Sequence, residues 1–155
     1  MKTIKRIATF KHFIGDLKIT YERTTLPTFK ITNSQSAYEF IRPYYAVNMD
    51  NKEEVRVIYL NNNNNVVNVS LHAIGGDSFV SVPIREILQH ALVLKVRAII
   101  MVHNHPSGQI KPSVQDIVIS CELKNACTQV GLKYLDSLIV TREHYYSLSD
   151  NGDID

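Results

Sequence analysis

The stretch Val96-Arg-Ala-Ile-Ile-Met-Val-His-Asn-His-Pro-Ser-Gly108 joins an apolar run to a polar turn. Its first part, residues 96–102, is short, apolar and rich in β-branched side chains, which is typical of a buried strand. Successive side chains of an extended segment point to opposite sides, so His103 and His105 share one side. The sequence therefore predicts a buried strand that presents two imidazoles at its carboxyl end.

The residues around this strand predict further elements from their periodicity and turn signals. In chain order, these are a short helix from Ser34 through Phe40 and Ile41, a strand from Glu53 to Leu60, a turn over Asn61–Asn65, a strand from Val66 to Ala73, a helix from Pro83 to about Lys95, the strand Val96–Val102, a helix from Val114 to Val130, and strands at Leu138–Val140 and Tyr145–Leu148. Gly75 and Gly76 end the hairpin, and Gly131 closes the long helix. The order β-β-α-β-α-β-β indicates an α/β (α+β) fold with a mixed sheet and helices packed against it.

Composition predicts one ordinary globular domain. The chain has 155 residues, of which 45% are hydrophobic and 21% charged, enough to bury one full-sized core. We expect residues 1–30 to be an N-terminal extension and residues 31–155 to be the domain. The net charge of +2 is too small to indicate nucleic acid by itself. The basic residues near the start are more typical of a solvated tail, and they are Lys2, Lys5, Arg6 and Lys11.

Two cysteines bear on the compartment. Cys121 and Cys127 fall in one predicted helix and form no zinc-binding pair, so we expect core thiols. The sequence shows no signal peptide and no apolar run long enough to span a bilayer. We therefore expect a cytoplasmic protein with no membrane partner.

A carboxylate downstream of the two histidines suggests a metal site. Asp116 lies eleven residues beyond His105, near enough to fold back and complete three protein ligands with His103. Three ligands leave a fourth position open for water. In such a site, zinc lowers the pKa of its water towards ~7, which makes hydroxide available at neutral pH.

The full spacing resembles that of a known family. His-x-His, seven residues, Ser113, two residues and Asp116 is similar to the JAMM (MPN+) metallopeptidase signature at every position. The strings at 102–108 and 111–117 more narrowly resemble the RadC family of JAB-domain proteins, and the similarity extends from about Leu17 to about Gly152. Larger RadC members carry an N-terminal helix-hairpin-helix region, and the resemblance is to short members without it.

The resemblance implies a JAB/MPN fold, a cytidine-deaminase-like sandwich of a central mixed sheet flanked by helices. It also implies one zinc ion per chain, held by His103, His105 and Asp116. A glutamate on an upstream strand would act as general base, and the Ser113 hydroxyl would stabilise the oxyanion. The implied activity is that of a metallopeptidase or isopeptidase acting on a peptide or protein substrate.

Two adjacent glutamates could supply the base. Members of the family place it eight residues before the Asp or Asn that ends the following strand, here Asn61, and this count selects Glu53. Alternation puts Glu53 and Glu54 on opposite faces, so only one faces the metal. Glu54 could instead pair with Arg56 as a surface contact. The choice favours Glu53 but depends on a register that a single bulge would change.

Each site residue also has a structural interpretation. Ser113 and Asp116 are typical of a helix N-cap with an acidic first turn, which does not exclude the chemistry. His103 and His105 could be partly buried histidines, while Asn104 between them would point away and tie down the loop. Ser107 is more typical of a turn hydroxyl than of a substrate contact. The remaining histidines lack ligand spacing or lie at a helix periphery, and they are His12, His72, His90 and His144.

A second function belongs to a different class. RadC proteins have carried a DNA-repair label, so the chain could be a DNA-associated accessory or binding module with a structural or vestigial metal site. Three positions depart from the common family pattern: Asn61, Gln109 and Ser137. The Ser137 departure could alter either the residues around the metal ligands or the substrate groove. Substrate, oligomeric state and the choice of zinc over manganese or iron stay open.

Overall fold

The computed structural model describes residues 12, 14–75 and 80–155, which form a mixed five-stranded sheet with three α-helices. The elements are α1 (Ser34–Ile41), the 3-10 helix η1 (Arg42–Tyr45), β1 (Glu54–Leu60), β2 (Val66–Ile74), α2 (Ile84–Val93), β3 (Ala98–Asn104), α3 (Val114–Gln129), β4 (Lys133–Val140) and β5 (Tyr145–Ser147). The strand order is β2-β1-β3-β4-β5, with only the β3–β4 pair parallel. The predicted α/β fold is confirmed.

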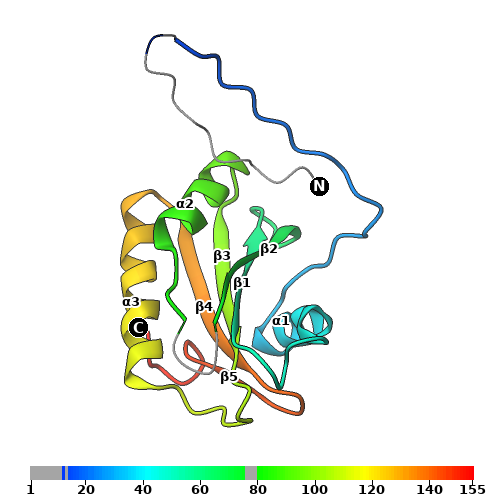
Figure 1. Ribbon diagram of the computed structural model, residues 1–155, viewed down its shortest axis with the longest axis vertical. Coiled ribbons are helices and arrows are strands. Elements are labelled where there is room, and N and C mark those ends of the chain that lie inside the picture. Colours follow the sequence, from blue (N-terminus) through cyan, green and yellow to red (C-terminus); the bar gives the residue numbers. More distant parts are fainter. Residues whose placement is uncertain (1–11, 13, 76–79) are drawn as a thin grey trace.

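Two hydrophobic cores lie on the two faces of the sheet. α1 and η1 pack on one face, and α2 and α3 cover the other (Figure 1). Along β3, Ala98, Ile100 and Val102 belong to the α1 core, while Ile99 and Met101 belong to the core under α2 and α3. This alternation places the next residue, His103, on the face that α3 covers.

The β1–β2 hairpin is closed by the predicted asparagine turn. Asn64 adopts a φ of 58°, a left-handed conformation that asparagine tolerates. The Oδ1 atom of Asn61 accepts hydrogen bonds from the backbone N–H groups of Asn63 and Asn65, both at 3.0 Å. The asparagine run therefore supplies both the backbone conformation and the side-chain bonds that the turn needs.

Some predicted boundaries were wrong. β4 begins at Lys133 rather than Leu138, because the polar pair Asp136 and Ser137 interrupts its apolar pattern although both residues are buried. The Asp136 carboxylate accepts a hydrogen bond from the Ser147 hydroxyl at 2.5 Å, which satisfies it inside the sheet. The helix α2 ends at Val93, before the expected Lys95. Helix η1, with Pro43 in its first turn, was not predicted.

The N-terminal segment is only partly described. Residues 14–29 contain no helix or strand, but the hydroxyls of Tyr21 and Thr28 donate to the β2 carbonyl oxygens of Val67 at 2.7 Å and Val66 at 3.0 Å. The proposed division at residue 30 stays a prediction. The DNA-binding alternative also stays a prediction, because its basic residues lie outside the described residues; they are Lys2, Lys5, Arg6 and Lys11. Gly76, which was predicted to end the hairpin, lies outside the described residues as well.

The described part of the chain contains no helix long and apolar enough to cross a membrane. Cys121 and Cys127 are free thiols in α3. Cys127 is buried in the core under α2 and α3, and Cys121 is partly buried.

Candidate metal centre

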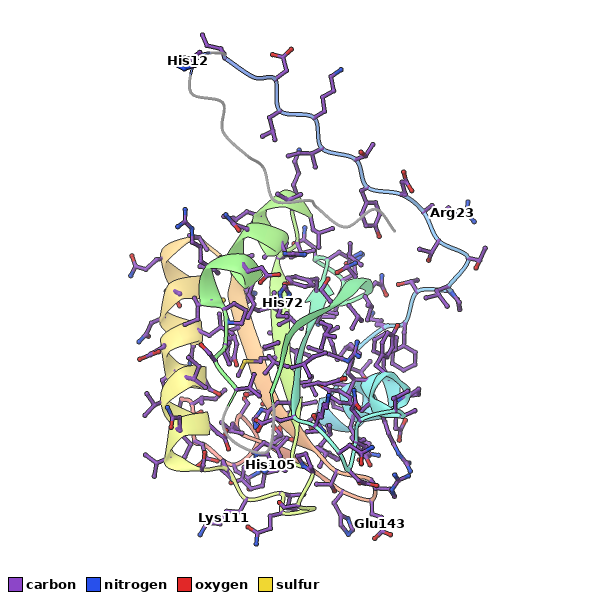
Figure 2. All side chains as sticks on the ribbon, viewed as in Figure 1. His12, Arg23, His72, His105, Lys111 and Glu143 are labelled. Atoms are coloured by element: carbon purple, nitrogen blue, oxygen red, sulfur yellow. The ribbon has the colours of Figure 1, made fainter. Side chains whose placement is uncertain are left out.

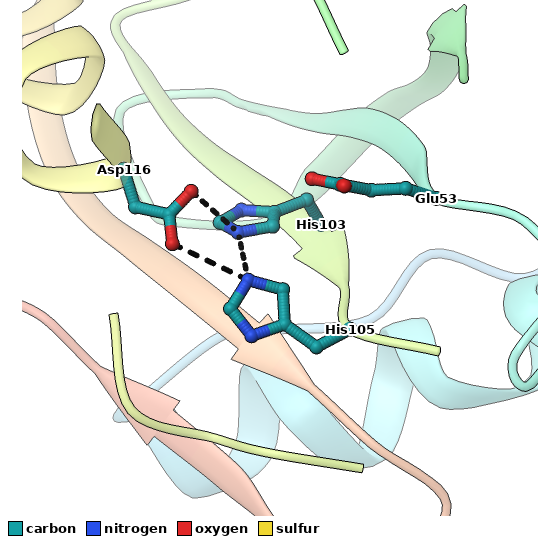
Figure 3. Close-up of side chains that lie close together, drawn as sticks. All are labelled: Glu53, His103, His105 and Asp116. Atoms are coloured by element: carbon teal, nitrogen blue, oxygen red, sulfur yellow. Dashed lines mark hydrogen bonds and ion pairs between the residues drawn. The ribbon is translucent and has the colours of Figure 1, made fainter. Parts of the chain in front are cut away.

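Four side chains converge at one end of the sheet (Figure 3). Glu53, His103, His105 and Asp116 each offer a ligand atom, and these atoms all lie within 4.8 Å of one another. The fold explains this, because β1 pairs with β3 so that Val55 lies opposite His103, and the start of one strand meets the end of the other. Asp116 comes from the first turn of α3.

The two imidazole rings lie close to each other, and each faces one oxygen of the Asp116 carboxylate. His103 Nε2 lies 3.0 Å from His105 Nε2 and 3.3 Å from Asp116 Oδ1, and His105 Nε2 lies 3.3 Å from Asp116 Oδ2. Ligands at ~2.0–2.1 Å from a tetrahedral zinc ion are separated by ~3.3 Å. The donor set and its spacing therefore fit zinc.

The turn after β3 orients His105. Its Nδ1 atom lies 2.7 Å from the carbonyl oxygen of Gln109, and donation of Nδ1–H to this carbonyl directs Nε2 towards Asp116. The turn needs Gly108, whose φ of 82° is strained for residues with a side chain. Because the Gln109 contact uses the backbone, the departure from the family pattern at this position leaves the contact intact.

Ser113 and Asp116 form a reciprocal cap at the start of α3. The Ser113 hydroxyl oxygen accepts from the Asp116 N–H at 3.0 Å, and Asp116 Oδ2 accepts from the Ser113 N–H at 2.8 Å. The cap locks the Asp116 carboxylate in an orientation that also faces both histidines. The structural interpretation of this pair is thus compatible with metal binding.

Charges in the cluster shift several pKa values. Burial raises the pKa of Asp116, but hydrogen bonds from His103 and His105 outweigh it and hold this pKa far below its ordinary value. Burial lowers the pKa of His105, yet the bonds to Asp116 and Gln109 produce a net rise. Burial raises the pKa of Glu53, with His103 and His105 opposing the shift. Asp116 is therefore ionised, as a metal ligand must be.

Glu54 is held on the opposite face of β1 from this cluster. Its carboxylate accepts from Arg56 Nη2 at 2.9 Å and from Asn48 Nδ2 at 2.6 Å. The expected Glu54–Arg56 contact exists, but it is buried rather than on the surface, because Tyr44 and Tyr45 flank the guanidinium. Of the two glutamates, only Glu53 joins the cluster.

Asn104, between the two histidines, holds the segment that precedes β1. Its side chain is fully buried on the α1 face, and its Oδ1 accepts from the Glu54 N–H at 2.7 Å. Its Nδ2 donates to three carbonyl oxygens, those of Asn48 at 3.2 Å, Met49 at 3.0 Å and Lys52 at 2.8 Å. The sequence predicted that Asn104 holds a loop in place. It did not predict that this loop is the segment that carries Glu53.

Two other predicted positions lie outside the cluster. Ser107 is exposed, and its hydroxyl accepts from the Gln109 N–H at 3.4 Å, as a turn hydroxyl does. Ser137 is fully buried and lies 3.0 Å from the Ser120 hydroxyl, which also donates to the Asp116 carbonyl oxygen at 2.7 Å. Ser137 therefore contacts α3 through Ser120, which is hydrogen-bonded to the ligand residue Asp116; its effect on a substrate groove stays a prediction.

Comparison with known proteins agrees with this geometry. The RadC-like JAB domain family matches residues 31–153. A UPF0758 protein of Streptococcus sanguinis is 40% identical over 106 residues, which are 68% of this chain and 47% of the relative. A UPF0758 protein of Carboxydothermus hydrogenoformans is 33% identical over 128 residues, 83% of this chain and 56% of the relative. The chain thus spans about half the length of the curated relatives it matches. This chain belongs to the RadC-like JAB domain family.

Proposed function

We propose that this domain is a zinc-dependent hydrolase of the peptidase or isopeptidase type. The observation that carries the proposal is the cluster of His103, His105 and Asp116, with separations of 3.0 to 3.3 Å between ligand atoms and the Glu53 carboxylate beside it. A carboxylate close to an open metal position is the arrangement that hydrolysis of an amide requires.

The three ligands would hold zinc, which supplies a strongly acidified water and a positive charge beside the substrate carbonyl. Manganese or iron can also bind nitrogen and oxygen ligands, and zinc is favoured by the two imidazoles with one carboxylate. The Asp116 cap and the His105–Gln109 contact fix two of the ligands before any ion binds. A preformed site of this kind lowers the entropy lost on metal binding.

Glu53 would take a proton from the attacking water and pass it to the leaving amine nitrogen. Glu53 is half-buried and free of the ion pair that occupies Glu54. The Ser113 hydroxyl would donate to the oxyanion formed from the amide carbonyl. Its oxygen accepts the Asp116 N–H in the cap, and this leaves its own proton free for donation.

Metal content tests the site first. After loading with zinc, the zinc content per chain is measured by elemental mass spectrometry. We expect the His103→Ala and Asp116→Ala variants each to bind one zinc ion per chain less than the wild type. His144→Ala is the matched control, because His144 is exposed and lies outside the cluster. Equal zinc content in all four proteins would reject the metal centre.

Activity then tests the proposed reaction. A peptide and isopeptide library incubated with the zinc-loaded chain should give cleavage that Glu53→Gln abolishes while its zinc content stays unchanged. Retained cleavage in Glu53→Gln would reject Glu53 as the base. A binding module would tolerate this substitution.

A further inference from the structure

A second cluster of ligand-type side chains lies away from the first (Figure 2). His72, Glu86 and His90 each offer a ligand atom, and these atoms lie within 4.8 Å of one another. His72 comes from β2, and the other two come from α2. Sequence patterns did not predict this cluster, because His72 lies on a different element from Glu86 and His90 and meets them only in the folded chain.

A β-bulge directs His72 towards α2. Val55 pairs with Ala73, and the next residue of β1, Arg56, pairs with Leu71, so His72 is an extra residue in β2. Bulges re-aim side chains and are frequent beside functional sites. The His72 side chain is fully buried. Because Glu86 and His90 are four residues apart on a helix, they share one face.

One nitrogen of the buried His72 ring has no hydrogen bond. Its Nε2 lies 2.6 Å from the Tyr59 hydroxyl, while Nδ1 lies 3.4 Å from Glu86 Oε1 without forming a hydrogen bond. Unpaired polar atoms are rare in protein interiors, and each one calls for an explanation.

The surrounding hydrogen bonds suit a metal ligand. The Tyr59 hydroxyl lies 3.3 Å from the carbonyl oxygen of Ile87 and can donate to it while accepting Nε2–H of His72. This pattern leaves Nδ1 of His72 as a lone pair aimed at the Glu86 carboxylate. Two electron-rich atoms in that position repel each other unless a cation lies between them. Metal-bound histidines commonly donate their second N–H in this way.

His90 is arranged to complete the set. Its Nδ1 atom lies 3.1 Å from the Glu86 carbonyl oxygen, and donation there leaves Nε2 free. The His72 and His90 rings meet edge to face, with centroids 4.8 Å apart. Glu86 is half exposed, so an ion can enter from solvent on that side.

We propose that His72, Glu86 and His90 form a second metal site, which takes a divalent transition ion of the zinc class and joins β2 to α2. Two imidazoles and one carboxylate are a common zinc ligand set. The site shares no residue with the Glu53 cluster. It stands independently of the proposed hydrolase, with a structural role in fixing α2 to the edge strand.

The test uses the full chain with the first centre removed. In a His103→Ala/His105→Ala background, dialysis against micromolar zinc followed by elemental mass spectrometry should give one zinc equivalent per chain. Adding His72→Gln or His90→Gln should remove that equivalent, and adding His144→Gln should not. His90 is less buried than His72, so the His90→Gln variant keeps the test valid if the His72→Gln variant misfolds.

Cobalt provides a second readout. The background variant titrated with Co²⁺ should develop visible d–d absorption that saturates at one equivalent and is lost in His90→Gln. No bound zinc in the background, or zinc retained in His90→Gln with native circular dichroism, would overturn the proposal. The cluster would then be a hydrogen-bonded network only. Neither result depends on the outcome at the first centre.

Discussion

Replacing Asn104 with alanine should loosen the segment that carries Glu53. The substitution removes the acceptor of the buried Glu54 N–H and the donor of three carbonyl oxygens. A buried donor left without a partner costs about 1–3 kcal/mol. Loss of the donor to the carbonyl of buried Met49 adds about 1 kcal/mol to this cost. Lys52 is exposed, so water can replace the donor that its carbonyl loses. We expect a total loss of about 3 kcal/mol in the free energy of unfolding.

Urea denaturation followed by circular dichroism measures this loss, with the slope against urea unchanged if the fold is retained. Asn51→Ala is the matched control, because Asn51 lies in the same segment and its amide bonds only the Val47 carbonyl at the surface. Zinc at the first centre should stay bound in Asn104→Ala, while cleavage falls because Glu53 is no longer positioned. A loss below about 0.5 kcal/mol would refute this reasoning, because it is smaller than the typical worth of one hydrogen bond.

Three further substitutions test separate parts of the structure. Glu54→Ala should lower the free energy of unfolding by about 2–3 kcal/mol in urea titrations, because it leaves the largely buried Arg56 without its carboxylate; an unchanged midpoint would contradict this. Ser113→Ala should cost about 1 kcal/mol by removing the cap of the Asp116 N–H, seen as a lower melting temperature, and Ser113→Thr should restore most of it. The pKa of His72 is about 4 in the fold against 6.5 ordinarily, so protonation favours the unfolded chain. Metal-free protein should therefore lose stability, on the order of 2 kcal/mol, as the pH falls from about 6.5 to about 4. His72→Gln should lose less over the same range in parallel denaturation series, and an equal loss would exclude His72 as the source. The charged and titratable groups facing His72 are Tyr59, Glu86 and His90.

Sequence patterns predicted those parts of the fold in which local signals and tertiary environment agree. The asparagine turn appears where expected, and the buried strand is present but spans Ala98–Asn104, two residues later than the predicted Val96–Val102. β4 was predicted too short, because buried Asp136 is satisfied by Ser147, a partner from another strand. Sequence spacing cannot indicate such a partner.

The first cluster could be predicted because most of its residues follow one strand and open the next helix. One short loop joins His103 and His105 to Asp116, and Glu53 follows from strand register. The second cluster depends on a bulge at His72 and on the packing of α2 against β2. Both are tertiary features, so the same reasoning that found the first cluster did not find the second.

From the position of β3 between an antiparallel and a parallel neighbour, we also expect an order of folding events. The β1–β2 hairpin closes through a short turn and can form early, whereas the β3–β4 pair requires α3 to cross over between them. Glu53 belongs to the first of these steps and Asp116 to the second, and β3 must join both. We therefore expect the first centre to capture its ion only when the sheet is complete, so that uptake of metal during refolding would report the last stage of assembly.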